Sequence, residues 1–190
     1  MASGNAGKIR EIARLLKGLG IDVVAQSAFA VEDAAETGTS FRENSLIKAR
    51  HAADATGLPA IADDSGLVVA ALDGAPGVYS ARYAGPDCDD EANNDKLLTE
   101  LEGVSDRSAA FYCVATFIEP GGKPLFAEGE WRGSILQQRQ GDGGFGYDPL
   151  FYVPDCDCSS AELTQEQKNA RSHRGQALCK LVALIEHRFS

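Results

Sequence analysis

The chain has 190 residues, of which 44% are hydrophobic and 24% charged, so it is long enough for one globular domain and too apolar for a disordered chain. Its formal net charge of −10 argues against binding to a nucleic-acid polymer through the phosphate backbone. No apolar run approaches the roughly 20 residues of a membrane span, and residues 1–11 lack the apolar segment of a secretory signal, which predicts a cytoplasmic protein without a membrane partner.

Helix periodicity, capping residues and turn residues predict alternating helices and strands. In chain order, the predicted elements are a helix at 8–19, a strand at 21–25, a helix at 40–57, strands at 59–62 and 67–72, a helix at 90–101, strands at 109–118, 124–131 and 150–153, and a helix at 176–189. Ser40 with Glu43, and Thr164 with Gln167, form capping boxes. The interleaved pattern, with one hairpin at EPGGKP, predicts an α/β fold with a mixed sheet.

The five cysteines are odd in number and irregularly spaced. Cys156-Asp157-Cys158 is too closely spaced for half of a zinc site, and no second pair matches it. We therefore expect free thiols in a reducing compartment and assign Cys156 and Cys158 no role.

A glycine-rich segment, Ser3-Gly4-Asn5-Ala6-Gly7-Lys8, comes directly before the first predicted helix. Free N–H groups at a helix start, with Lys8 beside them, suit a phosphate group. The segment is not a Walker A loop, because it has Ala2 and Ile9 where that motif needs Gly and Ser or Thr. A glycine-rich turn with a solvent-exposed lysine explains the same residues.

Two adjacent carboxylates, in Asp63-Asp64-Ser65-Gly66, follow an apolar strand. Successive side chains on a strand point to opposite faces, so only one of the two should enter a given site. Clustered carboxylates near phosphates commonly bind Mg²⁺, and Glu36 is the candidate second ligand. The alternative is a polar turn, because Asp-Ser-Gly is also typical turn sequence.

Two further segments have residue types that suit a nucleotide. Lys168-Asn169 and Ser172-His173-Arg174 offer donors for a phosphate or a purine edge, or else form a capped helix junction with solvated charges. Phe145-Gly146-Tyr147-Asp148-Pro149 follows a glycine-rich run. Its rings can stack on a base, or they can anchor the loop to the core.

Six segments are specific as a set. They read SGNAGK, AETGTSFRENSLIKAR, IADDSGL, GAPGVYSARYAG, GGFGYDPLF and AELTQEQKNARSHRGQAL. In this order, and over nearly the whole chain, the sequence resembles the inosine triphosphate pyrophosphatase family, the Ham1-type pyrophosphatases of non-canonical purine nucleotides, in its bacterial form.

The resemblance implies a reaction and a fold. ITP, dITP and XTP are split between the α and β phosphates, which gives the monophosphate and pyrophosphate and clears deaminated purines from the nucleotide pool. It also implies Mg²⁺, a homodimer, and one domain over residues 1–190 with an elongated mixed sheet flanked by helices and two lobes around a central cleft.

The resemblance also implies roles for individual residues. Asp64 is the general base and a metal ligand, and Glu36 is the second metal ligand. It implies that Ser3, Gly4, Asn5 and Lys8 bind the triphosphate and that Ser65 contacts the substrate. It implies that Phe145, Gly146, Tyr147 and Asp148 form the base slot. It also implies that Lys168, His173 and Arg174 contact the phosphate and the purine.

One departure from the family is the beginning of the chain. The family has a short apolar strand before its Ser/Thr-Gly-Asn turn, whereas this sequence reads Met1-Ala2-Ser3. We therefore expect a truncated first strand and lower stability than in a form extended by about five apolar residues. Two alternatives remain: a Maf-type nucleotide pyrophosphatase, and a nucleotide-binding module without catalysis.

Overall fold

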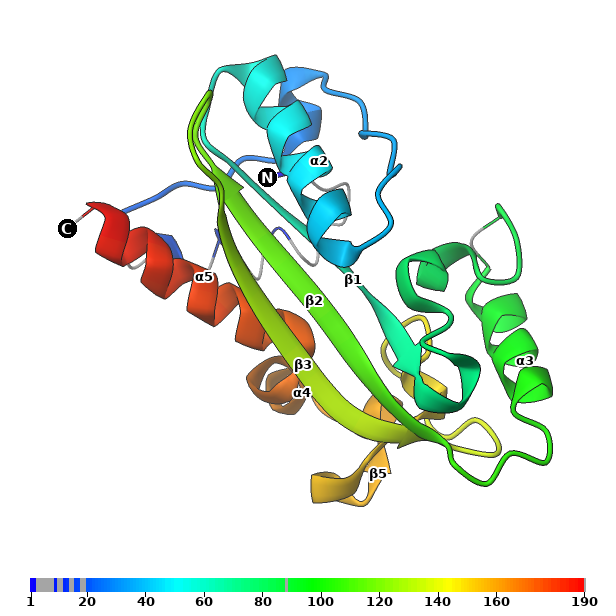
Figure 1. Ribbon diagram of the computed structural model, residues 1–190. Helices are drawn as coiled ribbons and strands as arrows, with labels where there is room; N and C mark the ends of the chain where they lie inside the picture. The colour runs from blue at the N-terminus through cyan, green and yellow to red at the C-terminus, as the bar shows by residue number, and fades with distance from the viewer. Residues whose placement is uncertain (3–8, 10–11, 14–15, 18–19, 88, 190) are drawn as a thin grey trace. The chain divides into compact units, whose positions relative to one another are not determined.

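A computed structural model describes residues 1–2, 9, 12–13, 16–17, 20–87 and 89–189 (Figure 1). Its helices and strands are α2 (Phe41–Thr56), β1 (Ala60–Val69), α3 (Asp90–Glu100), β2 (Ser108–Ile118), β3 (Leu125–Ile135), β4 (Phe151–Val153), β5 (Cys158–Ser159), α4 (Gln165–Arg171) and α5 (His173–Phe189). In these ranges the strands form one sheet in the order β1-β2-β3-β4-β5, and the β3–β4 and β4–β5 pairings are antiparallel. The α/β prediction is confirmed.

The chain forms two compact units. The first comprises Met1–Asp64, Cys113–Gly129 and Arg174–Ser190, and the second comprises Ser65–Tyr112 and Glu130–His173. Each of the long strands β1, β2 and β3 therefore supplies residues to both units. The central cleft stays a prediction.

In the first unit, strand β1 separates two apolar layers. Ala60 and Ala62 pack with the buried alanines of α2. Ile61 packs with Leu178 and Leu181 of α5. Since alternate residues of a strand face opposite sides, α2 and α5 cover opposite faces of β1. The side chains of the next two residues, Asp63 and Asp64, therefore also point to opposite faces of β1.

Helix α2 has the predicted ends. The Ser40 hydroxyl accepts a hydrogen bond from the Glu43 N–H (3.2 Å), and Gly57 ends the helix with φ +68°. Glycine reaches this left-handed conformation without the steric penalty of a Cβ atom. The fixed start of α2 matters for function, because Glu36 lies in the segment directly before it.

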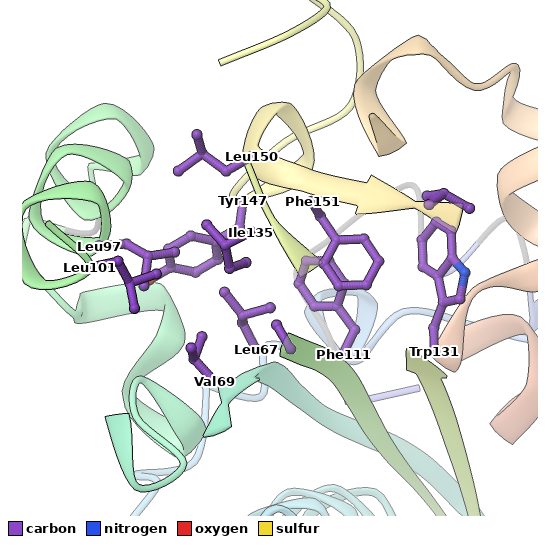
Figure 2. Packing of buried hydrophobic residues seen from close by; sticks show 12 residues of the cluster. Leu67, Val69, Leu97, Leu101, Phe111, Trp131, Ile135, Tyr147, Leu150 and Phe151 are labelled. Carbon is purple, nitrogen blue, oxygen red and sulfur yellow. The ribbon is translucent and has the colours of Figure 1, made fainter. Parts of the chain in front are cut away.

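The second unit has its own core, shown in Figure 2. Helix α3 contributes Leu97, and Leu101 follows directly after the helix; both are fully buried. They pack in one cluster with side chains of β1, β2, β3, β4 and the segment before β4: Leu67, Val69, Ala109, Phe111, Trp131, Ile135, Tyr147, Leu150, Phe151 and Val153. Burying a leucine of this kind stabilises the fold by about 1.5–3 kcal/mol, so α3 is a firmly fixed element of this unit.

Several sequence predictions need correction. The segment Ile21–Ala25 is not a strand: the Met1 amino group donates to the Val24 carbonyl (2.6 Å), and Ile21 and Val24 are exposed. Apolar alternation predicts a strand only where a neighbouring strand pairs along its length. The two predicted strands at 59–62 and 67–72 are one strand, β1, and α5 begins at His173 rather than Gln176.

Other predictions lie partly outside the described residues. The described residues of the predicted helix at 8–19 include Ile9, Ile12 and Leu16, which are helical. Cys113, Cys156, Cys158 and Cys179 are free thiols, as predicted. No helix in the described ranges is long and apolar enough to cross a membrane.

Candidate functional site

Side chains of α2 hold the segment that precedes this helix. The Glu43 carboxylate accepts from the N–H and the hydroxyl of Thr39 (2.7 and 2.9 Å). The Asn44 side-chain oxygen accepts from the Gly38 N–H (2.8 Å). A Cβ atom at Gly38 would lie 2.6 Å from the Glu43 Cβ atom, so only glycine fits this close approach. The path of the chain that carries Glu36 is thereby fixed.

One turn further along α2, Lys48 connects two carboxylates. Its Nζ atom donates to Glu36 Oε1 and to Asp64 Oδ1, both at 2.8 Å. The second oxygen of Asp64 accepts a longer bond from Asn44 Nδ2 (3.4 Å). Asn44 and Lys48 are four residues apart and therefore lie on one face of the helix. The predicted pair Glu36 and Asp64 is brought together, and α2 orients Asp64 through both of its oxygens.

The pKa values of both Asp64 and Lys48 are shifted by burial and by neighbouring charges. Burial raises the pKa of Asp64 above its ordinary value, while Lys48 and Asn44 oppose that rise. For Lys48, burial alone would lower the pKa, but the attraction of Asp64 and Glu36 outweighs it and the pKa is raised. The lysine therefore stays charged between the two carboxylates.

The same carboxylates suit a divalent cation. Their oxygens already converge on one positive group, the Lys48 ammonium. Within the described ranges no cluster of three or more His, Cys, Asp or Glu residues forms a metal site. Mg²⁺ is commonly bound through one or two carboxylates, with waters and substrate phosphates as the remaining ligands. Glu36 and Asp64 fit that pattern.

Asp63 points to the other face of β1, as the strand alternation predicts. Its Oδ2 atom accepts from Arg174 Nε at 3.1 Å, and the two side chains retain only 1% and 12% of their exposure. The carboxylate without a predicted role thus fixes the guanidinium of Arg174. These adjacent aspartates, in the interior of β1, therefore bond to partners on two opposite faces, α2 and α5.

The two rings of the FGYDP loop have different environments. Tyr147 is 4% exposed and its hydroxyl donates to the Ser80 carbonyl (2.8 Å). Phe145 is 57% exposed, and the Lys168 ammonium lies 4.8 Å from its ring centroid. Of these two rings only Phe145 is accessible to a base in this conformation, and Tyr147 anchors the loop to the core.

Asp148 is buried and holds the same loop together. Its carboxylate accepts from the Ser160 hydroxyl (2.9 Å) and the Phe145 N–H (2.8 Å), and it forms an ion pair with Lys168. A Cβ atom at Gly144 would lie 2.1 Å from this carboxylate. In this conformation Asp148 stabilises the loop through its bond to the Phe145 N–H and its ion pair with Lys168.

The remaining predicted site residues are placed as follows. His173 is buried at the start of α5 and stacks on Phe111, with ring centroids 4.9 Å apart and an angle of 12° between the planes. Ser65 is half-buried in β1. The phosphate segment Ser3–Lys8 lies outside the described residues.

Nearly the whole sequence matches one family. A sequence model described as the Ham1 family matches residues 1–184. The chain belongs to the Ham1 family.

Individual Ham1-type relatives match over most of the chain. A protein of Photobacterium profundum named dITP/XTP pyrophosphatase is 56% identical over 98% of this chain and 96% of its own length. A protein of the same name from Pectobacterium atrosepticum is 54% identical over 98% and 97%. Among solved structures, a HAM1 protein from Coxiella burnetii has a TM-score of 0.94 and 49% identity over 97% of this chain and 96% of its own. The Ham1 protein of Staphylococcus aureus has a TM-score of 0.93 and 43% identity over 98% and 97%.

Sequence reasoning missed two residues of this Ham1-family site. Asn44 and Lys48 lie in the quoted segment AETGTSFRENSLIKAR, where the sequence alone assigns them only to a helix. Their i, i+4 spacing was the available signal, because it puts an amide and an ammonium on one helix face. What they contact depends on β1, which the spacing alone does not specify.

Proposed function

We propose that this protein hydrolyses the non-canonical purine nucleoside triphosphates ITP, dITP and XTP to the monophosphate and pyrophosphate. The observation that carries the proposal is the convergence of Glu36 and Asp64 on one cation position, with Asp64 buried. Relatives more than half identical over nearly their whole length are named dITP/XTP pyrophosphatase, which supports the same substrates.

The chemical step is in-line attack of water on the α phosphorus. Asp64 orients the water and takes its proton, a new P–O bond forms, and pyrophosphate leaves with the electrons of the broken bond. Glu36 and Asp64 would hold Mg²⁺, which when bound neutralises charge on the phosphate oxygens. Lys48, held by both carboxylates, is placed to add a positive charge to the same region.

The other predicted contacts complete the triphosphate site. Ser3, Gly4, Asn5 and Lys8 bind the phosphates through backbone N–H groups and the lysine ammonium. Ser65 adds a hydroxyl. For these residues the support is the match of the motif to the family, not an observed contact.

The base is held by stacking and by donors. The exposed ring of Phe145 stacks on the purine, with Lys168, His173 and the loop around Gly146 to Asp148 beside it. Arg174 donates to the 6-keto oxygen of hypoxanthine or xanthine. Adenine has an amino group there, which would leave a donor facing a donor, a mismatch that lowers the rate by orders of magnitude.

The resemblance further supports two assignments about the protein as a whole. We propose that it acts as a homodimer and that it works in the cytoplasm, where the nucleotide pool is found. Size-exclusion chromatography with light scattering tests the first, since a mass of about one chain at micromolar concentration contradicts a dimer.

The function is tested by turnover of a nucleotide panel with Mg²⁺. ITP and XTP should give monophosphate and pyrophosphate rapidly, with GTP and ATP nearly untouched. Preference for methylated or pyrimidine nucleotides would indicate the Maf-type alternative instead. Tight binding of ITP without turnover would indicate a binding module and refute the enzymatic proposal.

A further inference from the structure

The backbone of the FGYDP loop is fixed by side chains of helix α3. The Gly146 N–H donates to Asp90 Oδ2 at 2.7 Å, and the Gly146 carbonyl accepts from Asn94 Nδ2 at 3.0 Å. Asp90 and Asn94 are four residues apart, so they present both partners from one helix face. Together with the bond from the Phe145 N–H to Asp148, three polar groups of the Phe145 and Gly146 backbone are held by side chains.

Helix α3 is suited to this task because the face that carries Asp90 and Asn94 is anchored in the core further along, by Leu97 and by Leu101 directly after the helix. Leu97 and Leu101 are fully buried in the core of the second unit, as Figure 2 shows. Asn94, by contrast, is a polar residue with no exposed surface inside a helix. Asparagine favours helices weakly, and burying its amide is unfavourable unless it is bonded. The bond to Gly146 satisfies its Nδ2 group, while its Oδ1 atom has no hydrogen-bond partner among the described residues.

The geometry explains how a large apolar ring stays in solvent. Gly146 has φ +61°, a left-handed conformation that turns the chain between Phe145 and Tyr147. Tyr147 then enters the core while Phe145 stays 57% exposed. A free loop would lose this arrangement, because Phe145 would pack against any nearby apolar surface.

We propose that Asp90 and Asn94 are positioning residues that hold Phe145 as a preformed stacking platform for the purine base. The inference rests on the proposed function and adds the residues that set affinity for the base. A loop ordered in advance loses less conformational entropy when the base binds. Ordering a residue only on binding lowers affinity by roughly tenfold, which corresponds to about 1.4 kcal/mol.

The test is the split between KM and kcat for ITP. Asn94→Ala should raise KM about tenfold and leave kcat within about twofold, since Asp64 and Glu36 are unaffected. Asp90 is exposed, so Asp90→Ala should fold normally and raise KM in the same direction. Asp90→Asn keeps an accepting oxygen and should stay near the wild-type KM.

Asn93→Ala is the matched control on the same helix. Asn93 is also buried, but its amide bonds to the Ala81 carbonyl and the Ala84 N–H, not to the loop. It should lower the melting temperature without raising KM. An equal rise of KM in Asn93→Ala would mean that loss of stability alone explains the effect, and would overturn the inference.

A double-mutant cycle separates positioning from a general structural role. If α3 acts through the Phe145 ring, Asp90→Ala should raise KM no further in a Phe145→Ala background. Additive effects, or an unchanged KM in both Asp90→Ala and Asn94→Ala, overturn the inference while the wild type still turns over ITP. A wild type that does not hydrolyse ITP refutes the proposed function itself.

Discussion

Replacement of Lys48 by methionine tests the electrostatics of the carboxylate pair. Lys48 is the cation between Glu36 and Asp64, with both N–O distances at 2.8 Å. Methionine keeps a flexible side chain of similar length and removes the charge. The group of three then changes from one net negative charge to two, with Asp64 buried.

The magnitude follows from the burial of the three side chains. Removing one partner of a buried ion pair destabilises a protein by about 3–5 kcal/mol. The side chains of Lys48 and Glu36 keep 15% and 29% of their exposure, so the lower end applies. For a chain of this size, about 3 kcal/mol lowers the melting temperature by roughly 6–12 °C.

The assay is thermal unfolding followed by circular dichroism, in EDTA and in excess Mg²⁺. In EDTA, Lys48→Met should melt roughly 6–12 °C below the wild type. Excess Mg²⁺ should raise the melting temperature of Lys48→Met more than that of the wild type. The reason is that the ion and the Lys48 ammonium compete for the same two oxygens, one of Glu36 and one of Asp64. Lys123→Met, at an exposed lysine in the β2–β3 connection, is the control and should leave the melting temperature unchanged. If Lys48→Met melts like the control, or if Mg²⁺ stabilises wild type and variant equally, the reasoning is refuted.

Four other measurements address separate parts of the site. Asp64→Asn should lower kcat for ITP by about 10²–10⁴-fold while calorimetry still detects nucleotide binding; a near-normal rate contradicts its role as base. Burial raises the pKa of Asp64 above its ordinary 3.8, and only the ionised carboxylate can accept the proton of the water. The value of kcat/KM should therefore fall as the pH decreases through that raised pKa, and a fall that begins only at or below pH 3.8 would contradict the role of Asp64 as base. Asp63→Asn leaves Arg174 without its charged partner and should raise KM for ITP by about tenfold or more, whereas an unchanged KM would separate Arg174 from the base. Tyr147→Phe leaves the Ser80 carbonyl without this donor and should lower stability by about 1–2 kcal/mol in urea unfolding with kcat unchanged; a large fall in kcat would give the hydroxyl a role in turnover.

The parts of the fold predicted correctly are those with local causes. Ser40 and Gly57 delimit α2 through backbone capping, which a short window of sequence determines. The alternation of Asp63 and Asp64 between opposite faces follows from strand geometry alone. Ile21–Ala25 has the same apolar character as a strand, but strand formation depends on a partner elsewhere in the chain, and the prediction was wrong.

The candidate site shows the same division between local and distant causes. Residue type singles out Glu36 and Asp64, whose role as metal ligands stays a prediction, whereas Lys48, which bonds to both, was missed because its partners are set by packing of α2 on β1. The sequence does not distinguish Phe145 from Tyr147, since both rings flank one glycine. Their difference arises from the Ser80 carbonyl and from α3, which lie far away along the chain.

In the proposed reaction, water activated by Asp64 attacks the α phosphorus of a deaminated purine nucleotide. Hydrolysis of ITP in ¹⁸O-labelled water, with the products resolved by mass spectrometry, tests it most directly. One labelled oxygen is expected in inosine monophosphate and none in pyrophosphate. Label in pyrophosphate, or release of inosine diphosphate and orthophosphate, would contradict it.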